Sequence, residues 1–158
     1  LQVAFSSTSR SGFAKAHEIS AFSLLPLVEG AAPMMKKRGG GSIISMSFIG
    51  SVLAVPHYHV MGPAKASLES SSRYLAKEVG PDNIRVNVIS PGPIKTLSAS
   101  GIKDFAELMK IGGAHSAMKR TVTQEEVANT ALFLASDASS GITGQVIYVD
   151  CGYSIMAN

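Results

Sequence analysis

The sequence predicts an α/β fold in which helices flank a doubly wound parallel sheet. Helical and strand-like patterns alternate along the chain, as they do in folds built from βαβ units. Residues 42–47 form a short apolar run suited to a buried strand, residues 84–89 are rich in branched side chains, and residues 145–149 form a last strand. Ligands gather at the carboxyl ends of such strands, so residues 45–48, 90–94 and 150–152 should share that edge.

Two helices are expected around the first strand. Residues 12–35 carry apolar side chains at three-residue steps, with a kink expected at Pro26. Pro63 fits the first turn of the second helix, and Glu69 is expected on its outer side, paired with Arg73.

The second half of the chain is expected to be less regular. Residues 90–93 should end the second strand, because a proline has no N–H to donate to the ladder. Residues 96–120 are expected to be irregular apart from a helix at residues 104–109. Thr123 and Glu126 form a capping box that opens the last helix.

Composition narrows the function classes. The 158 residues fit one domain, and 46% apolar with 16% charged residues is typical of a soluble globular protein. No run approaches the roughly 18 apolar residues of a membrane span, which favours the cytoplasm, or the matrix of a plastid or other organelle. The net charge of +3 argues against nucleic acid as a partner. The lone Cys151 is expected to be a small buried residue.

Tyr58 and Lys65 are the strongest chemical signal, because a phenol and an ammonium lie seven residues apart around a helix start. A phenol that donates a hydrogen bond, with a cation that lowers its pKa, suits a reaction in which an oxygen becomes negative. The pair therefore suggests hydride transfer. A tyrosine in such a loop is more often a packing residue. His57 and His59 flank Tyr58 and are expected to serve the turn, since they lack partners at metal-ligand spacing, and no metal site is expected.

Three segments follow one another along the chain: the first strand with Tyr58 and Lys65, the Pro91-Gly92 turn, and residues 142–144 before Val149-Asp150. In this order they resemble the short-chain dehydrogenase/reductase superfamily. Residues 60–69, 92–105 and 119–123 resemble, within it, segments of the enoyl-[acyl-carrier-protein] reductases. Ketone reductases of the superfamily place their tyrosine four residues before the lysine, where this chain has Met61. A methionine cannot donate a proton, and the tyrosine seven residues before the lysine resembles the enoyl reductases.

The resemblance implies a Rossmann-like fold, of which this chain would be the carboxyl-terminal half, as one partial domain over residues 1–158. It implies reduction of the trans-2 double bond of enoyl thioesters on acyl carrier protein, with NADH as the cofactor, and a homo-oligomer, dimer or tetramer, with no nucleic acid or membrane partner. Tyr58 and Lys65 would be catalytic. The implied cofactor-binding residues are Met46, Ser47, Lys65, Gly92, Ile94, Lys95, Thr96, Leu97 and Ser98. The implied substrate-pocket residues are Phe48, Tyr58, Met61, Ile102 and Phe105.

The chain departs from the family in three places. Phe48 stands where the family usually has a tyrosine, so an orienting hydroxyl is lost there, and Pro91 stands where alanine is common. The glycine-rich turn that binds the pyrophosphate is missing, so the chain alone is expected to bind dinucleotide poorly and to expose a sheet edge. Two alternatives stay open: another short-chain reductase acting on a carbonyl substrate, and a non-catalytic piece that retains the oligomer interface.

Overall fold

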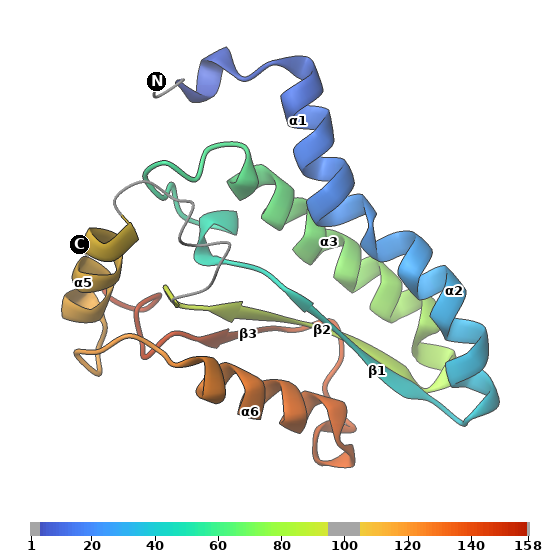
Figure 1. Ribbon diagram of the computed structural model, residues 1–158. Coiled ribbons are helices and arrows are strands. Elements are labelled where there is room, and N and C mark those ends of the chain that lie inside the picture. The colour runs from blue at the N-terminus through green and yellow to red at the C-terminus, as the bar shows by residue number, and fades with distance from the viewer. Residues whose placement is uncertain (1–3, 95–104, 158) are drawn as a thin grey trace.

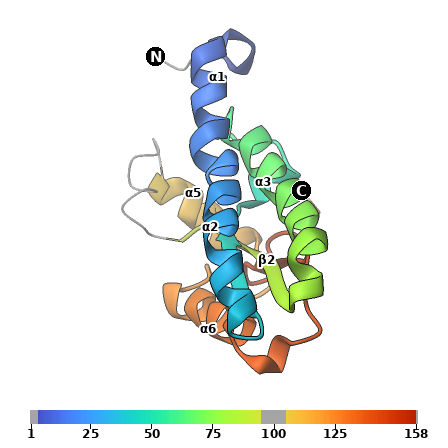
Figure 2. The same ribbon diagram turned by 90° about the vertical axis from the view of Figure 1, so that its right-hand side faces the viewer.

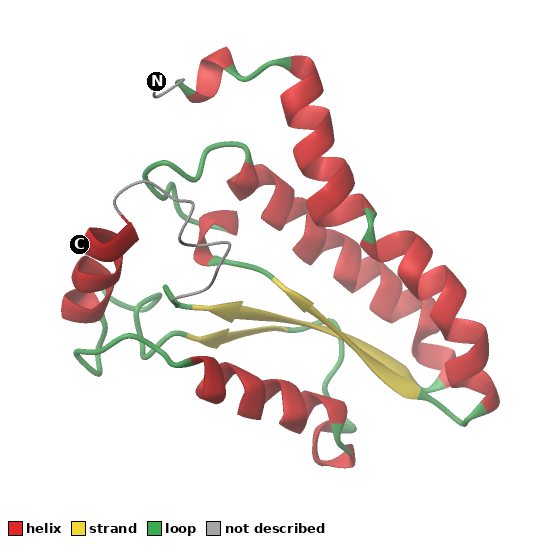
Figure 3. Ribbon diagram, viewed as in Figure 1, coloured by secondary structure: helices red, strands yellow, loops and turns green. Residues whose placement is uncertain are grey.

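The computed structural model describes residues 4–94 and 105–157, and its centre is a three-stranded parallel sheet in the order β1-β2-β3. The strands are β1 (Gly41–Met46), β2 (Ile84–Pro91) and β3 (Val146–Val149). Gly41 pairs with Ile84 at the start of the β1–β2 ladder, and Val88 pairs with Val146 at the start of the β2–β3 ladder. The α/β architecture with a parallel sheet is as predicted, and all three strands end on the same side of the molecule (Figures 1 and 3).

Five α-helices accompany the sheet in the described part of the chain. They are α1 (Arg10–His17), α2 (Leu24–Lys37), α3 (Met61–Val79), α5 (Phe105–His115) and α6 (Gln124–Ala135). Figures 1 and 2 show α2 and α3 lying side by side on one face of the sheet and α6 on the other. None of the helices described is long and apolar enough to cross a membrane.

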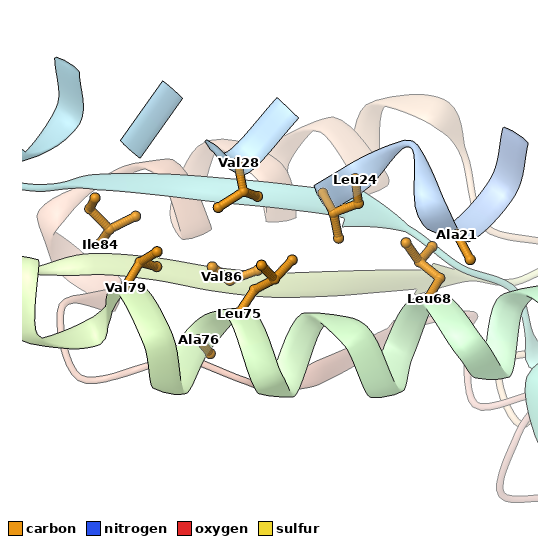
Figure 4. Close-up of a cluster of buried hydrophobic side chains, with 9 residues drawn as sticks. All are labelled: Ala21, Leu24, Val28, Leu68, Leu75, Ala76, Val79, Ile84 and Val86. Carbon is orange, nitrogen blue, oxygen red and sulfur yellow. The ribbon is translucent and has the colours of Figure 1, made fainter. Parts of the chain in front are cut away.

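Each face of the sheet has its own apolar cluster, because successive strand residues point to opposite faces. Toward α2 and α3, Ile84 and Val86 of β2 pack against Leu24 and Val28 of α2 and Leu75 of α3 (Figure 4). Toward α6, Ile89 of β2 packs with Val122, Val127 and Leu134. The central strand β2 is thus buried on both faces, which explains its run of branched residues.

The first predicted helix is interrupted. Between α1 and α2, residues Glu18–Phe22 form a wider π-helical turn, and the Ser23 amide donates to the Glu18 carbonyl five residues earlier. A proline ring clashes with the carbonyl four residues before it, and for Pro26 that residue is Phe22, the last of this turn. The effect expected from Pro26 therefore appears one turn earlier than the proline itself, which lies in the first turn of α2.

Two other expectations are wrong. The ladder does not stop before Pro91, which pairs with Val149. The Val88 and Gly92 amides donate to the carbonyls of Gln145 and Val149. Since alternate residues face opposite neighbours, the nitrogen of Pro91 points to the β1 side, beyond the last paired residue of β1.

Glu69 does not lie on the outer side of α3 with Arg73. It is only 6% exposed, and its carboxylate accepts a hydrogen bond from the Ser47 hydroxyl. The helical pattern predicts Glu69 opposite the apolar stripe, but a carboxylate is buried where it has a partner, and here the partner is Ser47, directly after β1.

Candidate active site

The carboxyl edge of the sheet brings together segments that are far apart in the chain. Residues 46–48 lie at the end of β1, residues 92–94 follow β2, and residues 150–152 follow β3. The start of α3 and the short helical turn Ile49–Ser51 approach the same edge, and α5 also lies at this end (Figure 1). The loops expected to surround a ligand are therefore neighbours.

Lys65 is fixed by the end of β1. Its Nζ donates a 2.8 Å hydrogen bond to the carbonyl oxygen of Met46. Burial lowers the pKa of Lys65 below its usual value because desolvation disfavours the ammonium, and the negative charge of Glu69, one helical turn later, opposes part of this shift. An ammonium carries three N–H donors, so this bond leaves two N–H groups without an acceptor among the described residues.

Tyr58 lies in the loop before α3 and packs on Phe48. The two rings meet edge to face, with 4.9 Å between centroids and an interplanar angle of 61°. Phe48 and Met46 are two residues apart, so Tyr58 and Lys65 are both held by the same short segment at the end of β1. The structure therefore brings the two predicted catalytic residues to one site.

The pKa of Tyr58 contradicts the sequence-based expectation. Burial raises the pKa of the phenol to about 12, because the charged phenolate would lose its hydration. The lowering expected from Lys65 is wrong for this arrangement, in which desolvation is the cause and the ammonium is directed to the Met46 carbonyl. Tyr58 thus remains protonated, and able to donate, throughout the neutral pH range.

The backbone on both sides of Tyr58 is left-handed. His57 has φ of 63° and His59 has φ of 43°, a region that few residues other than glycine and asparagine adopt readily. The two imidazole rings lie 6.3 Å apart. These dihedral angles support the predicted role of the two histidines in the turn. Among the residues described, no group of three or more His, Cys, Asp and Glu side chains could hold a metal.

Gly50 and Gly62 allow the Tyr58 loop to approach the turn after β1. A side-chain carbon at Gly50 would overlap the edge of the Tyr58 ring, and one at Gly62 would come within 2.7 Å of the Gly50 carbonyl oxygen. Sequence reasoning missed Gly50, because a single glycine in a loop gives no signal of what packs against it. Its close approach to Tyr58 makes it a part of the site.

A cavity of about 430 Å³ lies next to Tyr58. Most of its wall is apolar and comes from Phe5, Leu53, Val55, Pro56 and Pro63. A cavity of this size falls in the range of small-molecule sites. The phenol is therefore placed at the border of an apolar space, which suits a polar headgroup followed by an alkyl chain.

The other predicted site residues are placed as follows. Gly92 approaches Asp150 so closely that an added side-chain carbon would lie 3.0 Å from its Cα, and Ile94 packs on the α6-side cluster. Met61 contacts Ser20 through a 3.9 Å O–H···S bond and does not line the cavity. Lys95, Thr96, Leu97, Ser98 and Ile102 lie outside the described residues. Phe105 begins α5, without a described side chain.

Comparisons with known proteins agree with this arrangement. A family model described as "Enoyl-(Acyl carrier protein) reductase" matches residues 1–154. Two curated proteins named enoyl-[acyl-carrier-protein] reductase [NADH] are similar: the one from Nostoc sp. is 57% identical over 152 residues, and the one from Neisseria meningitidis is 56% identical over 151 residues. Each alignment covers 96% of this chain and 58% of the relative, so the chain spans little more than half of these proteins.

Solved structures are similar as well. The enoyl-acyl carrier protein reductase of Bacillus cereus, solved with NADP+ and an indole naphthyridinone, superimposes with a TM-score of 0.94 at 47% identity, covering 99% of this chain and 60% of that one. The reductase of Anaplasma phagocytophilum, solved with NAD, gives a TM-score of 0.92 at 37% identity, covering 99% and 57%. The Rossmann-like fold predicted from the sequence is confirmed.

Proposed function

Because the chain belongs to the enoyl-(acyl carrier protein) reductase family, we propose that it carries the catalytic part of an NADH-dependent reductase. The reaction would saturate the trans-2 double bond of enoyl thioesters on acyl carrier protein, in fatty acid biosynthesis. The observation that carries the proposal is the joint placement of Tyr58 and Lys65. The segment 46–48 holds the ring of one through Phe48 and the ammonium of the other through the Met46 carbonyl.

The proposed role of Tyr58 follows from where charge develops. Bound NADH would supply a hydride to the β-carbon of the enoyl thioester, and the thioester oxygen would gain the charge of an enolate. The Tyr58 phenol would donate a hydrogen bond to that oxygen and stabilise it. Since burial holds the pKa of Tyr58 at about 12, the phenol keeps its proton and donates throughout the neutral range. The adjoining apolar cavity suits the acyl chain.

The proposed role of Lys65 is to hold the cofactor. Two of its N–H groups have no acceptor among the described residues, and an ammonium with two such donors suits the paired hydroxyls of a ribose. The donor set therefore fits a nicotinamide nucleotide. The remaining cofactor contacts are proposed at Met46, Ser47, Gly92, Ile94 and residues 95–98, with Phe48, Met61, Ile102 and Phe105 proposed for the substrate pocket.

An assay of the protein expressed from the complete reading frame that encodes this chain tests the function. Oxidation of NADH should be rapid with a trans-2-enoyl thioester and negligible with a β-ketoacyl thioester, and NADPH should be a poorer donor. Faster reaction with the ketoacyl thioester would instead favour a carbonyl reductase. No oxidation with either thioester would favour a non-catalytic role.

We further propose that the protein is a homo-oligomer, a dimer or tetramer, which assembles through α2 and α3. A groove of about 560 Å³ runs between these helices and is lined in part by Leu25, Val28 and Tyr74. Leu27 and Tyr74, on the same two helices, are 68% and 75% exposed, so they offer apolar surface that a partner subunit could cover. Light scattering should show a discrete oligomer, and Leu27→Glu should dissociate it. We place the reaction in the cytoplasm or an organelle matrix.

A further inference from the structure

Glu69 is a buried carboxylate that the proposed reaction does not use directly. It lies on α3 one turn after Lys65 and is 6% exposed, while its hydrogen-bond partner Ser47 is 5% exposed. In the described part of the chain, the ion pairs are Lys36 with Asp82 and Arg120 with Glu126, so no cation there lies within ion-pair distance of Glu69. Burying a carboxylate in this way is costly, and such a cost calls for a function.

Ser47 occupies the middle of the segment that holds both catalytic residues. The residue before it is Met46, whose carbonyl accepts from Lys65, and the residue after it is Phe48, whose ring packs on Tyr58. The amide of Ser47 donates a 2.7 Å hydrogen bond to the Ile89 carbonyl. The backbone of Ser47 is thus tied to β2, and its side chain is tied to α3 through Glu69.

We propose that Glu69 is a positioning residue, which acts through the Ser47 hydroxyl to fix the segment 46–48 and thereby the relative placement of Lys65 and Tyr58. The inference rests on the proposed reductase function. Without the Glu69–Ser47 bond, the end of β1 keeps its backbone bond to β2 and the Lys65–Met46 bond to α3, but Ser47 itself is no longer fixed to that helix. The Met46 carbonyl and the Phe48 ring can then shift relative to α3, and the two donors separate. Displacements of this kind reduce the rate even when the fold is retained.

The charge of Glu69 gives the bond a second effect on the same site. Lys65 and Glu69 lie four residues apart on one face of α3, and the carboxylate favours the charged form of the ammonium against desolvation. The hydrogen bond to Ser47 keeps the carboxylate at the depth where it acts on Lys65.

The test is a double-mutant cycle in the protein from the complete reading frame. Ser47→Ala and Glu69→Leu should each lower kcat about tenfold, the equivalent of one hydrogen bond in the transition state. The double variant should be no slower than the slower single variant, because both changes remove the same bond. Glu69→Gln keeps an acceptor oxygen and should stay within about threefold of the parent.

Ser72→Ala is the matched control, since Ser72 also lies on α3 and faces β1 through Ser45, at 3.5 Å, one step farther from the site. It should leave kcat unchanged. Melting temperatures are measured for every variant, so that a loss of kcat at unchanged melting temperature separates positioning from folding. Additive losses in the cycle, or a Glu69→Gln variant as slow as Glu69→Leu, would overturn the proposal.

A second measurement does not depend on activity. Hydrogen exchange of the backbone amide at position 47 should become faster in Ser47→Ala and Glu69→Leu. It should be unchanged in Glu69→Gln and Ser72→Ala. Unchanged exchange in the first two variants would overturn the positioning role. If the parent protein reduces no enoyl thioester, the proposed function fails, and the exchange data alone still decide whether Glu69 fixes the segment.

Discussion

The starts of α3 and α6 are held in opposite ways. At α6, the Thr123 hydroxyl accepts from the Glu126 amide and the Glu126 carboxylate accepts from the Thr123 amide, while Arg120 adds a 2.6 Å ion pair to Glu126. At α3, the N-cap residue Val60 provides no side-chain hydrogen bond, and the preceding loop contains two left-handed histidines. One helix start is stabilised by its own residues, whereas the other depends on contacts from distant segments.

The difference shows where a site can be placed. Local capping satisfies the free amides at a helix start and fixes its backbone, but it uses up the polar groups there. At α3 the ring of Tyr58 is held instead by Phe48 and Gly50, which leaves the phenol free for a ligand. A helix start that keeps a polar group available for a ligand is therefore expected to be locally less stable than a capped one.

The largest expected effect is that of Tyr58→Phe. Loss of the phenol should lower kcat about 10²- to 10³-fold, as the removal of one oxyanion donor does, with little change in melting temperature. The measurement is NADH oxidation with an enoyl thioester under saturating conditions. Tyr148→Phe, on β3, is the control and should retain full activity, and an equally large loss there would break the link between the α3 start and the chemistry.

The next largest effect is expected for Gly50→Ala. The added methyl group overlaps the Tyr58 ring, so the ring must move away from Phe48, and kcat should fall by at least about tenfold. Gly80→Ala, where nothing lies within 4 Å of the new methyl group, should leave kcat unchanged. Full activity of Gly50→Ala would mean that Tyr58 is not held from that side.

At α6 the expected effect is on stability alone. Thr123→Ala removes the cap and should lower the free energy of unfolding by about 1 kcal/mol, with kcat unchanged, as measured by chemical denaturation and by the same assay. A lower kcat at the same concentration of folded protein would show that the start of α6 affects the start of α3.

The pH dependence of stability should also distinguish the two helix starts. Hydrogen bonds from Arg120 and the Thr123 amide lower the pKa of Glu126 from 4.5 to about 2. A carboxyl group with a lowered pKa stabilises the fold above its unfolded-state pKa, so this contribution is lost as the pH falls from about 4.5 toward 2. In Glu126→Gln, the melting temperature should depend less on pH over that window. An unchanged pH dependence would contradict the stabilising role of the Thr123–Glu126 capping box.

The smallest effect is expected in the loop before α3. Glycine adopts the left-handed region without strain, so His59→Gly should raise the free energy of unfolding by a few tenths to about 1 kcal/mol, because relief of the positive φ exceeds the entropy cost of glycine. Denaturation compares the variant with its parent. A net loss of stability would show that the His59 side chain, and not only its backbone, holds the loop.

Sequence patterns predicted the parts of the molecule that local chemistry specifies. The three strands and the Thr123–Glu126 capping box follow from short apolar runs and capping residues, and the spacing of Tyr58 and Lys65 predicted the candidate site. Burial of Glu69, the direction of the Tyr58 pKa and the role of Gly50 were not predicted. Each depends on what packs against the residue from elsewhere in the chain, and a single sequence contains no signal for such contacts.

Asn87 determines how easily β3 separates from the rest of the sheet. It is fully buried in β2, where its side chain donates to the Ile142 carbonyl and accepts from the Gln145 amide, so that it extends the ladder into the loop before β3. A four-residue strand at the end of a sheet would ordinarily fray early. The Asn87 side chain holds the residues just before β3, so β3 can separate from β2 only if these buried hydrogen bonds also break. We therefore expect β3 to detach only when the whole domain unfolds.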